Sequence, residues 1–403
     1  MSKQELRDWA LWGGDPAFTS FRTTMNLVRP DKELFFQYAE KSFSAQHLTN
    51  HGPAVAELEQ QLALFHGVSH CICMCSASMG IMLAAKAISL EGKSEVIVPS
   101  FAPPATVDAL CWAGLVPCFC DVDPGTLTLS ASEAKKHIGE ATSLIVAPHP
   151  RIYLCNSAEL EQLGKKQNIP VLFDSVEAFG SVQNGRKTGT FGNCEAFSFH
   201  AGKVLNACEG GYITTNDTAL ATQLRSTRAF GFFGKDNILH LGHNAKMNEL
   251  HAAMALASLS RVKEIFHDNE WLHRSYQMHL RGLPGFTCVP YETHEKRNWN
   301  SLLVRLDSRW PFTLEETLAV LNAENIHARA YYAEPRHSAC HQLVSTQPHF
   351  SVSEHVAQTH LLLPFGYTMS MEDTAVVGIV LHDLYTMRYE IKEALQSRNH
   401  HEA

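Results

Sequence analysis

The chain has 403 residues, of which 45% are hydrophobic and 18% charged, and its formal net charge at pH 7 is −8. This composition predicts a globular protein with one large domain and a smaller one. The acidic balance without a basic block gives nucleic-acid binding no electrostatic support, and no apolar run is long enough to span a bilayer.

The cysteines and the N-terminus indicate the compartment. The first residues show no cationic region followed by an apolar one, so we expect no secretory signal. Eleven cysteines in such a chain predict reduced thiols and a cytoplasmic location. Cys71, Cys73 and Cys75 alternate as on one face of a strand, but no Cys or His pair has zinc-like spacing, so we expect no metal.

The first 90 residues predict an irregular arm followed by a strand between two helices. Apolar periodicity over Val55–Phe65 predicts a helix, and Val68–Cys75 is strand-like. Ser76, Ala77 and Ser78 then open an apolar helix over Met79–Leu90. A turn of small residues before a helix favours an anion site, because amides and the positive dipole end converge there. The alternative is that Ser76 or Ser78 only caps the helix.

Strands and helices alternate from Glu95 to Asp174. Short apolar strands are predicted at Glu95–Pro99, Val116–Asp121, Ser143–Ala147 and Pro170–Asp174, with helices at about 105–113 and 157–167. This alternation predicts an open, mainly parallel α/β sheet covered by helices on both faces. Ligands of such sheets bind beyond the carboxyl ends of the strands, where Asp174 stands. The alternative is that Asp174 caps a following helix.

A single lysine follows the next strand. Ala196–Phe199 is apolar and leads into His200-Ala201-Gly202-Lys203, before a further strand over Tyr212–Thr215. Lys203 is a candidate Schiff-base lysine, because an apolar setting favours the neutral, nucleophilic amine. The alternative is a solvated turn lysine. Since Asp174 and Lys203 both follow strand ends, we expect them to converge on one crevice.

The pattern changes beyond about Asp268. A small-residue helix over His251–Val262 precedes the change. A strand at Ser301–Leu306, a helix at Leu314–Ala323, a loop rich in His, Tyr and Pro at Arg329–His349 and a terminal helix near Met371–Ser397 follow it. We therefore predict a large α/β domain over 1–265, which includes an N-terminal arm over 1–50, and a small α+β domain over 266–403.

Several segments, in this order, resemble the DegT/DnrJ family of PLP-dependent sugar aminotransferases. They are LTNHGPAVAELEQQLA (48–63), EVIVPSFAPPATVDAL (95–110), PCFCDVDP (117–124), PVLFDSVEAFG (170–180), FSFHAGKVLNACEGGYITTND (197–217), LGHNAKMNELHAA (241–253) and LLLPFG (361–366). The resemblance covers nearly the whole chain. It implies the fold type I aminotransferase scaffold, with a mainly parallel seven-stranded sheet, and pyridoxal 5′-phosphate (PLP) as cofactor.

The resemblance also implies roles for single residues. Lys203 matches the lysine that forms the Schiff base with PLP. Asp174 matches the aspartate that keeps the pyridine nitrogen protonated, which makes the ring an electron sink. Phosphate contacts are implied for Ala77, Ser78, Met79 and Ser198, and for Asn244 of the neighbouring subunit. A residue from a second subunit implies a homodimer with a composite site.

Departures from the family pattern occur close to the implied cofactor. Pro103 stands where an aromatic ring usually stacks on the pyridine, and Phe101 is the residue that could replace that contact. Glu177 replaces a Gln or His near the phenolic oxygen, which a carboxylate would repel unless it were protonated or turned away. We therefore expect a raised pKa for Glu177. Lys246 replaces a common Arg, and Gly202 a hydroxyl residue or Asn.

The implied reaction moves an amino group from an amino acid, with L-glutamate expected, to a ketone of a nucleotide-linked keto-sugar or related cyclitol. Residues 298–300 and the loop Arg329–His349 are candidates for substrate contacts. One alternative is a non-transaminating PLP enzyme, a dehydratase or cyclase of natural-product biosynthesis. A dehydratase of this family typically has His in place of the lysine, which is retained here. The other alternative is a non-catalytic regulatory protein on the same scaffold.

Overall fold

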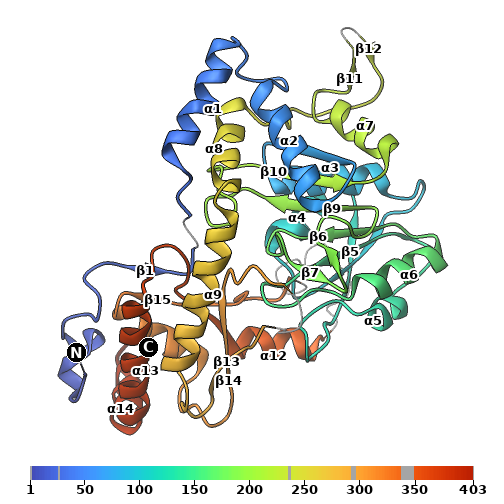
Figure 1. The fold of residues 1–403 in the computed structure, drawn as a ribbon. Coiled ribbons are helices and arrows are strands. Elements are labelled where there is room, and N and C mark those ends of the chain that lie inside the picture. The colour runs from blue at the N-terminus through green and yellow to red at the C-terminus, as the bar shows by residue number, and fades with distance from the viewer. Residues whose placement is uncertain (1, 26–27, 235–236, 292–295, 337–348, 403) are drawn as a thin grey trace.

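The computed structural model describes residues 2–25, 28–234, 237–291, 296–336 and 349–402. Figure 1 shows a larger unit built around a central sheet and a smaller unit below it, with α8 (Glu249–Leu259) and α9 (Val262–His279) running from one to the other. Both termini lie in the smaller unit.

The central sheet has seven strands in the order β2-β10-β9-β6-β5-β3-β4. Within the described residues, β10 is antiparallel to both neighbours and the other strands run parallel. The predicted mainly parallel α/β sheet is therefore confirmed. The strands are β2 (His70–Met74), β3 (Glu95–Pro99), β4 (Val116–Cys120), β5 (Thr142–Pro148), β6 (Val171–Asp174), β9 (Cys194–Ser198) and β10 (Gly211–Thr215).

Alternate strand residues point to opposite faces of this sheet, and both faces are covered. One face packs against α3 (Ala77–Ile88), α4 (Pro104–Trp112) and α7 (Thr218–Thr227). The other packs against α2 (Pro53–His66) and α8, and against α5 (Ala131–Lys136) and α6 (Ser157–Gln167). All residues of β5 are buried, which explains its unbroken apolar run.

The smaller unit is built on a four-stranded antiparallel sheet in the order β13-β14-β17-β16. These strands are β13 (Phe286–Cys288), β14 (Leu302–Leu306), β17 (His360–Leu363) and β16 (Arg329–Ala330). The helices around it are α10 (Leu314–Ala323), α12 (Ser351–Thr359), α13 (Met371–Thr386) and α14 (Arg388–Glu402). Instead of the single terminal helix predicted, two helices meet at Met387, whose sulfur accepts a hydrogen bond from Trp9 Nε1.

The N-terminal arm is divided between the two units. Its first part, with η1 (Leu6–Asp8) and η2 (Ala10–Trp12), buries Trp9 and Phe18 in the core of the smaller unit. The strand β1 (Arg22–Thr23) pairs with β15 (Ile326–His327) of that unit. Its last part, α1 (Lys32–Ser44), contacts α8. The arm therefore does not belong wholly to the large domain as predicted, while the boundary at 265 stays a prediction.

Two short hairpins complete the described elements. They are formed by β7 (Val182–Gln183) with β8 (Arg186–Lys187), and by β11 (Phe232–Phe233) with β12 (Asn237–Ile238). In the described part of the chain every cysteine is a free thiol, and no helix has the length and apolar character needed to cross a bilayer. The cytoplasmic location stays a prediction.

Candidate active site

The two residues singled out for catalysis lie at the same end of neighbouring parallel strands, Asp174 as the last residue of β6 and Lys203 past the end of β9. β6 and β9 pair in a register that places Asp174 opposite Ala196, and Ser175 N donates to Ala196 O at 2.8 Å. β9 then ends at Ser198, five residues before Lys203. The predicted convergence at the carboxyl edge of the sheet is therefore seen in the pairing of the strands.

Asp174 is a buried carboxylate held by two donors. Thr106 Oγ1 of α4 donates to Oδ2, and Val176 N donates to Oδ1 at 3.1 Å. Burial raises the pKa of Asp174, although these donors and the charge of Lys203 oppose the rise. Residues 175–181 form turns, so the alternative of a helix N-cap is wrong.

Lys203 lies in a tight turn and points inward. Its backbone N donates to His200 O at 2.8 Å, and Gly202 N donates to His200 Nδ1 at 3.1 Å. The side chain is 18% exposed, and its Nζ lies 2.5 Å from Glu177 Oε1. The alternative of a solvated turn lysine is therefore wrong.

Glu177 is buried and faces two cations. Its Oε1 contacts Lys203 and, at 3.0 Å, Arg151 Nη2, while Oε2 accepts from Asn300 Nδ2 at 3.3 Å. Burial alone would raise the pKa of Glu177, but the charges of Arg151 and Lys203 outweigh it and lower the pKa below its ordinary value. The raised pKa expected from the sequence is therefore wrong for this arrangement, and Glu177 is ionised at neutral pH.

The residues near position 299 support the backbone of Glu177. Asn298 Nδ2 and Asn300 Nδ2 each donate to Glu177 O at 2.9 Å, and Asn298 Nδ2 also donates to Phe179 O at 3.1 Å. These asparagines come from the smaller unit, so the site spans both units. Their contact with a substrate stays a prediction, as does that of the loop Arg329–His349, whose residues 337–348 lie outside the described residues.

Arg151 is a site residue that the sequence reasoning missed. It follows β5 and reaches both units: its Nη1 donates to Ser301 Oγ at 3.1 Å, and its N donates to Tyr331 OH at 2.8 Å. Its Nε is buried without a hydrogen-bond partner among the described atoms. The rule that singled out Asp174, a polar residue just past a buried strand, would also have found Arg151.

The predicted phosphate turn lies at the same edge of the sheet. Gly211 pairs with both Met74 and Ser198, which brings the start of α3 next to the end of β9. A Cβ on Gly211 would lie 2.5 Å from Ala77 N, so this close approach requires glycine.

The hydrogen bonds of this turn assign the cap. Ser76 Oγ accepts from Met79 N at 3.1 Å, so Ser76 is the N-cap of α3, as the capping alternative proposed. Ser78 is exposed in the first turn, and Ser198 Oγ accepts from His200 N at 3.1 Å. Phosphate contacts at Ala77, Ser78, Met79 and Ser198 stay predictions.

The remaining residues predicted for the site are Pro103, Phe101 and Asn244. Pro103 is half-buried at the start of α4, and its O accepts from Thr106 N at 3.1 Å. Phe101 is 3% exposed, and its ring packs against two tyrosines, 5.0 Å from Tyr331 and 4.9 Å from Tyr332 between centroids. Asn244 is exposed and forms a β-bridge with Ala229. Its contact with a neighbouring subunit stays a prediction.

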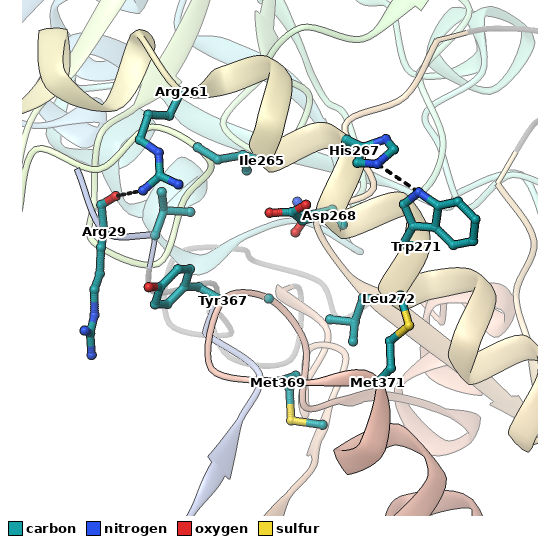
Figure 2. A pocket seen from close by; sticks show the side chains of 13 residues that line it. Arg29, Arg261, Ile265, His267, Asp268, Trp271, Leu272, Tyr367, Met369 and Met371 are labelled. Atoms are coloured by element: carbon teal, nitrogen blue, oxygen red, sulfur yellow. Dashed lines mark hydrogen bonds between the residues drawn. The ribbon is translucent and has the colours of Figure 1, made fainter. Parts of the chain in front are cut away.

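A separate pocket of about 580 Å³ is lined by residues of α9, by Val28 and Arg29, and by residues between Gly366 and Met371. Figure 2 shows Arg29, Arg261 and Tyr367 at one end and Trp271 with Met371 at the other. None of the predicted site residues lines it. It adjoins the site through Val28, whose O accepts from Asn206 Nδ2 at 2.7 Å and whose side chain packs in the same cluster as Val204 and Leu205.

The chain is similar in sequence to several known proteins. A model of the DegT/DnrJ/EryC1/StrS aminotransferase family matches residues 30–381. The dTDP-4-amino-4,6-dideoxy-D-glucose transaminase of Shigella dysenteriae is 28% identical over 312 residues, which are 77% of this chain and 84% of that protein. The GDP-perosamine synthase of Caulobacter vibrioides is 29% identical over 304 residues, 74% of this chain and 81% of that protein.

Solved structures extend the match to almost the whole chain. The structure of DesI in the presence of its TDP-sugar product has 32% sequence identity and a TM-score of 0.92, and the match covers 97% of this chain and 100% of the DesI chain. Helicobacter pylori PseC, an aminotransferase of pseudaminic acid biosynthesis, has a TM-score of 0.83 at 23% identity, covers 91% of this chain and supports the fold alone.

Proposed function

Because the chain belongs to the DegT/DnrJ/EryC1/StrS aminotransferase family, we propose that it transfers an amino group from an amino acid, L-glutamate, to a ketone of a nucleotide-linked keto-sugar or related cyclitol. Membership makes it a PLP-dependent aminotransferase on the fold type I scaffold, which confirms the predicted family, fold and cofactor. The sugar substrate is supported by the relatives, whose names describe transaminases and synthases of amino sugars.

The observation that carries the proposal is that Asp174, the last residue of β6, and Lys203, past the end of β9, lie at the same edge of the sheet. The residues at this edge fit PLP chemically. A lysine can bind its aldehyde, a buried carboxylate suits its pyridinium, and the start of α3 offers amides and a positive dipole end to its phosphate. Burial raises the pKa of the Asp174 carboxyl, and a pyridinium would supply a positive charge that favours its ionised form.

Bound PLP would supply an electron sink for the carbon that loses and gains a proton. The residues of the chain would do the rest. Lys203 holds the cofactor, is displaced by the amino donor, and then moves the proton at the substrate carbon as a general acid and base. Thr106, which donates to Asp174 Oδ2, would hold the carboxylate that pairs with the pyridinium. Ser78, Ser198 and the amides of Ala77 and Met79 would bind the phosphate.

We further propose that the working unit is a homodimer in which Asn244 completes the site of its partner. The segment before Asn244 carries several exposed apolar side chains. It includes the β11–β12 hairpin, which projects from the large unit (Figure 1). Phe230, Phe232, Phe233, Ile238, Leu239 and Leu241 are all exposed, Leu241 by 95%. A patch of this kind on a single chain is typical of a protein interface.

A half-reaction test examines the proposed transfer. Purified holoenzyme mixed with single amino acids and no acceptor should pass from the PLP to the pyridoxamine absorbance with L-glutamate, and Lys203→Ala should lack both the initial band and the conversion. Subsequent addition of nucleotide-linked keto-sugars should restore the PLP band. The proposed transfer is contradicted if the holoenzyme shows a Lys203-dependent cofactor band that no amino acid converts to the pyridoxamine band. A dehydratase would instead consume the sugar while the cofactor spectrum stays unchanged.

A further inference from the structure

Arg151, Glu177 and Lys203 form a row of alternating charges in the candidate active site. Glu177 Oε1 lies 2.5 Å from Lys203 Nζ and 3.0 Å from Arg151 Nη2, so one oxygen serves both cations. The Glu177 side chain is 5% exposed and that of Arg151 13%. A carboxylate this deep would be costly without its partners, and the charge of Arg151 is the largest single cause that offsets its burial, followed by Lys203.

The contacts of Arg151 are arranged to hold it still. Its backbone N is bound to Tyr331 OH and its Nη1 to Ser301 Oγ, both in the smaller unit. From the other side, Asn300 donates to both the O and the Oε2 of Glu177. These contacts therefore hold the Glu177 carboxylate in an orientation that places Oε1 against Lys203 Nζ, and they also favour its ionised form.

We propose that Arg151 is a positioning residue, which keeps the Glu177 carboxylate charged and aimed at Lys203 so that the lysine nitrogen retains its proton while it is linked to the cofactor. This inference rests on the proposed function. A protonated nitrogen makes the adjoining carbon electrophilic towards the amine of the donor. A neutral Gln at position 177 has no charge to stabilise that proton, whereas an ionised Glu has one.

Other groups also act on this proton. They are Asp174 at the end of β6, Arg329 of β16, and the phenols of Tyr291, Tyr331 and Tyr332. Asp174 attracts the proton. Arg329 repels it directly but also lowers the pKa of Glu177, and both residues are unchanged in the variants tested. The expected shifts therefore report on Arg151 and Glu177.

The test is a pH titration of the cofactor absorbance in the purified holoenzyme, without substrate. The midpoint at which the band of the protonated linkage disappears should fall in Glu177→Gln by about one pH unit or more, which is a tenfold change in proton affinity. In Arg151→Met it should also fall, because burial then favours a protonated, neutral Glu177. Arg151→Lys should restore most of the shift, since it returns the charge.

The double variant separates positioning from a merely structural role. Adding Arg151→Met to Glu177→Gln should cause no further fall, because the effect of Arg151 passes through Glu177. Arg186→Met serves as matched control, since Arg186 pairs with Glu161 at 2.8 Å in a contact that involves neither Glu177 nor Lys203. It should leave the midpoint unchanged. If Arg151→Met folds poorly, Arg151→Gln removes the charge with a polar side chain and carries the same expectation.

Opposite outcomes overturn the inference. A midpoint in the Arg151 variants equal to or above that of the wild type would mean that Glu177 keeps its charge and direction without Arg151. If the falls in the pH midpoint added up in the double variant, Arg151 would act independently of Glu177. These results leave the proposed function intact as long as the wild type shows a cofactor band that disappears in Lys203→Ala. Absence of that band would instead remove the proposed function.

Discussion

Two carboxylates three positions apart acquire opposite properties in this protein. Asp174 is surrounded by a hydroxyl and an amide donor, and burial raises its pKa. Glu177 is as deeply buried, but Arg151 and Lys203 lower its pKa. Burial favours the neutral form of both, and only a full opposite charge within contact distance reverses that preference. The contrast suits an aminotransferase, because among the described residues Asp174 has no ion pair at contact distance and a pyridinium could supply one.

The hydrogen bond from Thr106 to Asp174 should contribute to stability. Thr106→Val should destabilise the chain without cofactor by about 1–3 kcal/mol, because Asp174 Oδ2 loses a donor in a buried position. Urea unfolding followed by circular dichroism would measure the difference. Thr106→Ser keeps the hydroxyl and should remain closer to the wild type. Equal losses in the two variants would assign the effect to packing.

Glu195 provides a pH-dependent prediction. This buried carboxyl of β9 accepts from Ser175 Oγ and, at 2.6 Å each, from Gly189 N and Phe191 N. Burial raises its pKa from 4.5 to about 8. The folded protein therefore binds a proton that the unfolded chain has released. This contribution to stability is complete below about pH 4.5 and is lost as the pH rises through 8, by up to about 1.4 kcal/mol per pH unit.

Glu195→Gln should remove that slope, because its amide oxygen can accept from both backbone amides while its NH2 group donates to Ser175 Oγ. The free energy of unfolding of the two proteins should be similar at pH 5, and the variant should be the more stable at pH 8. Urea unfolding of the chain without cofactor at pH 5, 6.5 and 8 measures the difference. Parallel pH profiles of the two proteins would contradict the assignment.

At the scale of elements, the edge of the sheet explains why distant segments meet. β10 pairs with both β2 and β9, so that Gly211 brings the start of α3 beside the end of β9. The following segment returns to the same strands: Cys75 N donates to Ala245 O at 2.8 Å, and Met74 bridges to Lys246. Asn244 therefore lies at the surface next to the α3 turn, and the exposed hairpin precedes it.

The composite site leads to a complementation prediction. Lys203→Ala and Asn244→Ala homodimers should each be almost inactive. Mixed and allowed to exchange subunits, they should recover about a quarter of the wild-type activity, because half of the dimers are mixed and each carries one intact site. Activity of the mixture is measured against each variant alone. If Asn244 acted within its own chain, the mixed dimers would hold no intact site and no activity would return.

The hairpin can be tested on its own. Leu241→Asp should weaken the dimer and lower the mass measured by light scattering at dilute concentration, since a charge would enter an apolar interface. Met278→Asp on α9, where the side chain is 65% exposed, is the matched control and should leave the mass unchanged. An unchanged mass in Leu241→Asp would place the interface elsewhere.

At the scale of the whole molecule, the N-terminal segment ties the two units together. Trp9 has no exposed surface and packs among residues of α13 and α14, whereas α1 contacts α8 of the large unit. The connecting residue Met25 passes the lysine turn, with its Cε 3.3 Å from where a Cβ on Gly202 would lie. A larger residue before Lys203 would therefore press on this segment.

Trp9→Ala should cost about 3–5 kcal/mol of stability, as expected for a fully buried Trp. Thermal unfolding would show the loss, and Trp112→Ala, whose side chain is 83% exposed, serves as control. A small effect of Trp9→Ala would mean that the segment can leave the core without consequence.

The order of strands and helices, and the polar residues at the ends of the strands, could be predicted from the amino-acid sequence. Apolar runs of strand length and helical periods are local, so α6 and α10 occur at their predicted bounds and all seven strands of the main sheet fall on predicted runs. The same local patterns predicted the positions of Asp174, Lys203 and the α3 turn. They did not predict where Trp9 packs, because an apolar residue in an irregular arm does not show which core will bury it.

The charge state of the site was decided only by the tertiary structure. Glu177 viewed in sequence has no cation beside it, and the expected repulsion from the cofactor predicted a raised pKa. In the fold, Glu177 contacts Arg151, which follows β5, Lys203, which follows β9, and Asn300 of the smaller unit. The charges of Arg151 and Lys203 lower the pKa of Glu177 instead of raising it. Electrostatic interactions depend on distances between segments far apart in the chain, and only folding sets those distances.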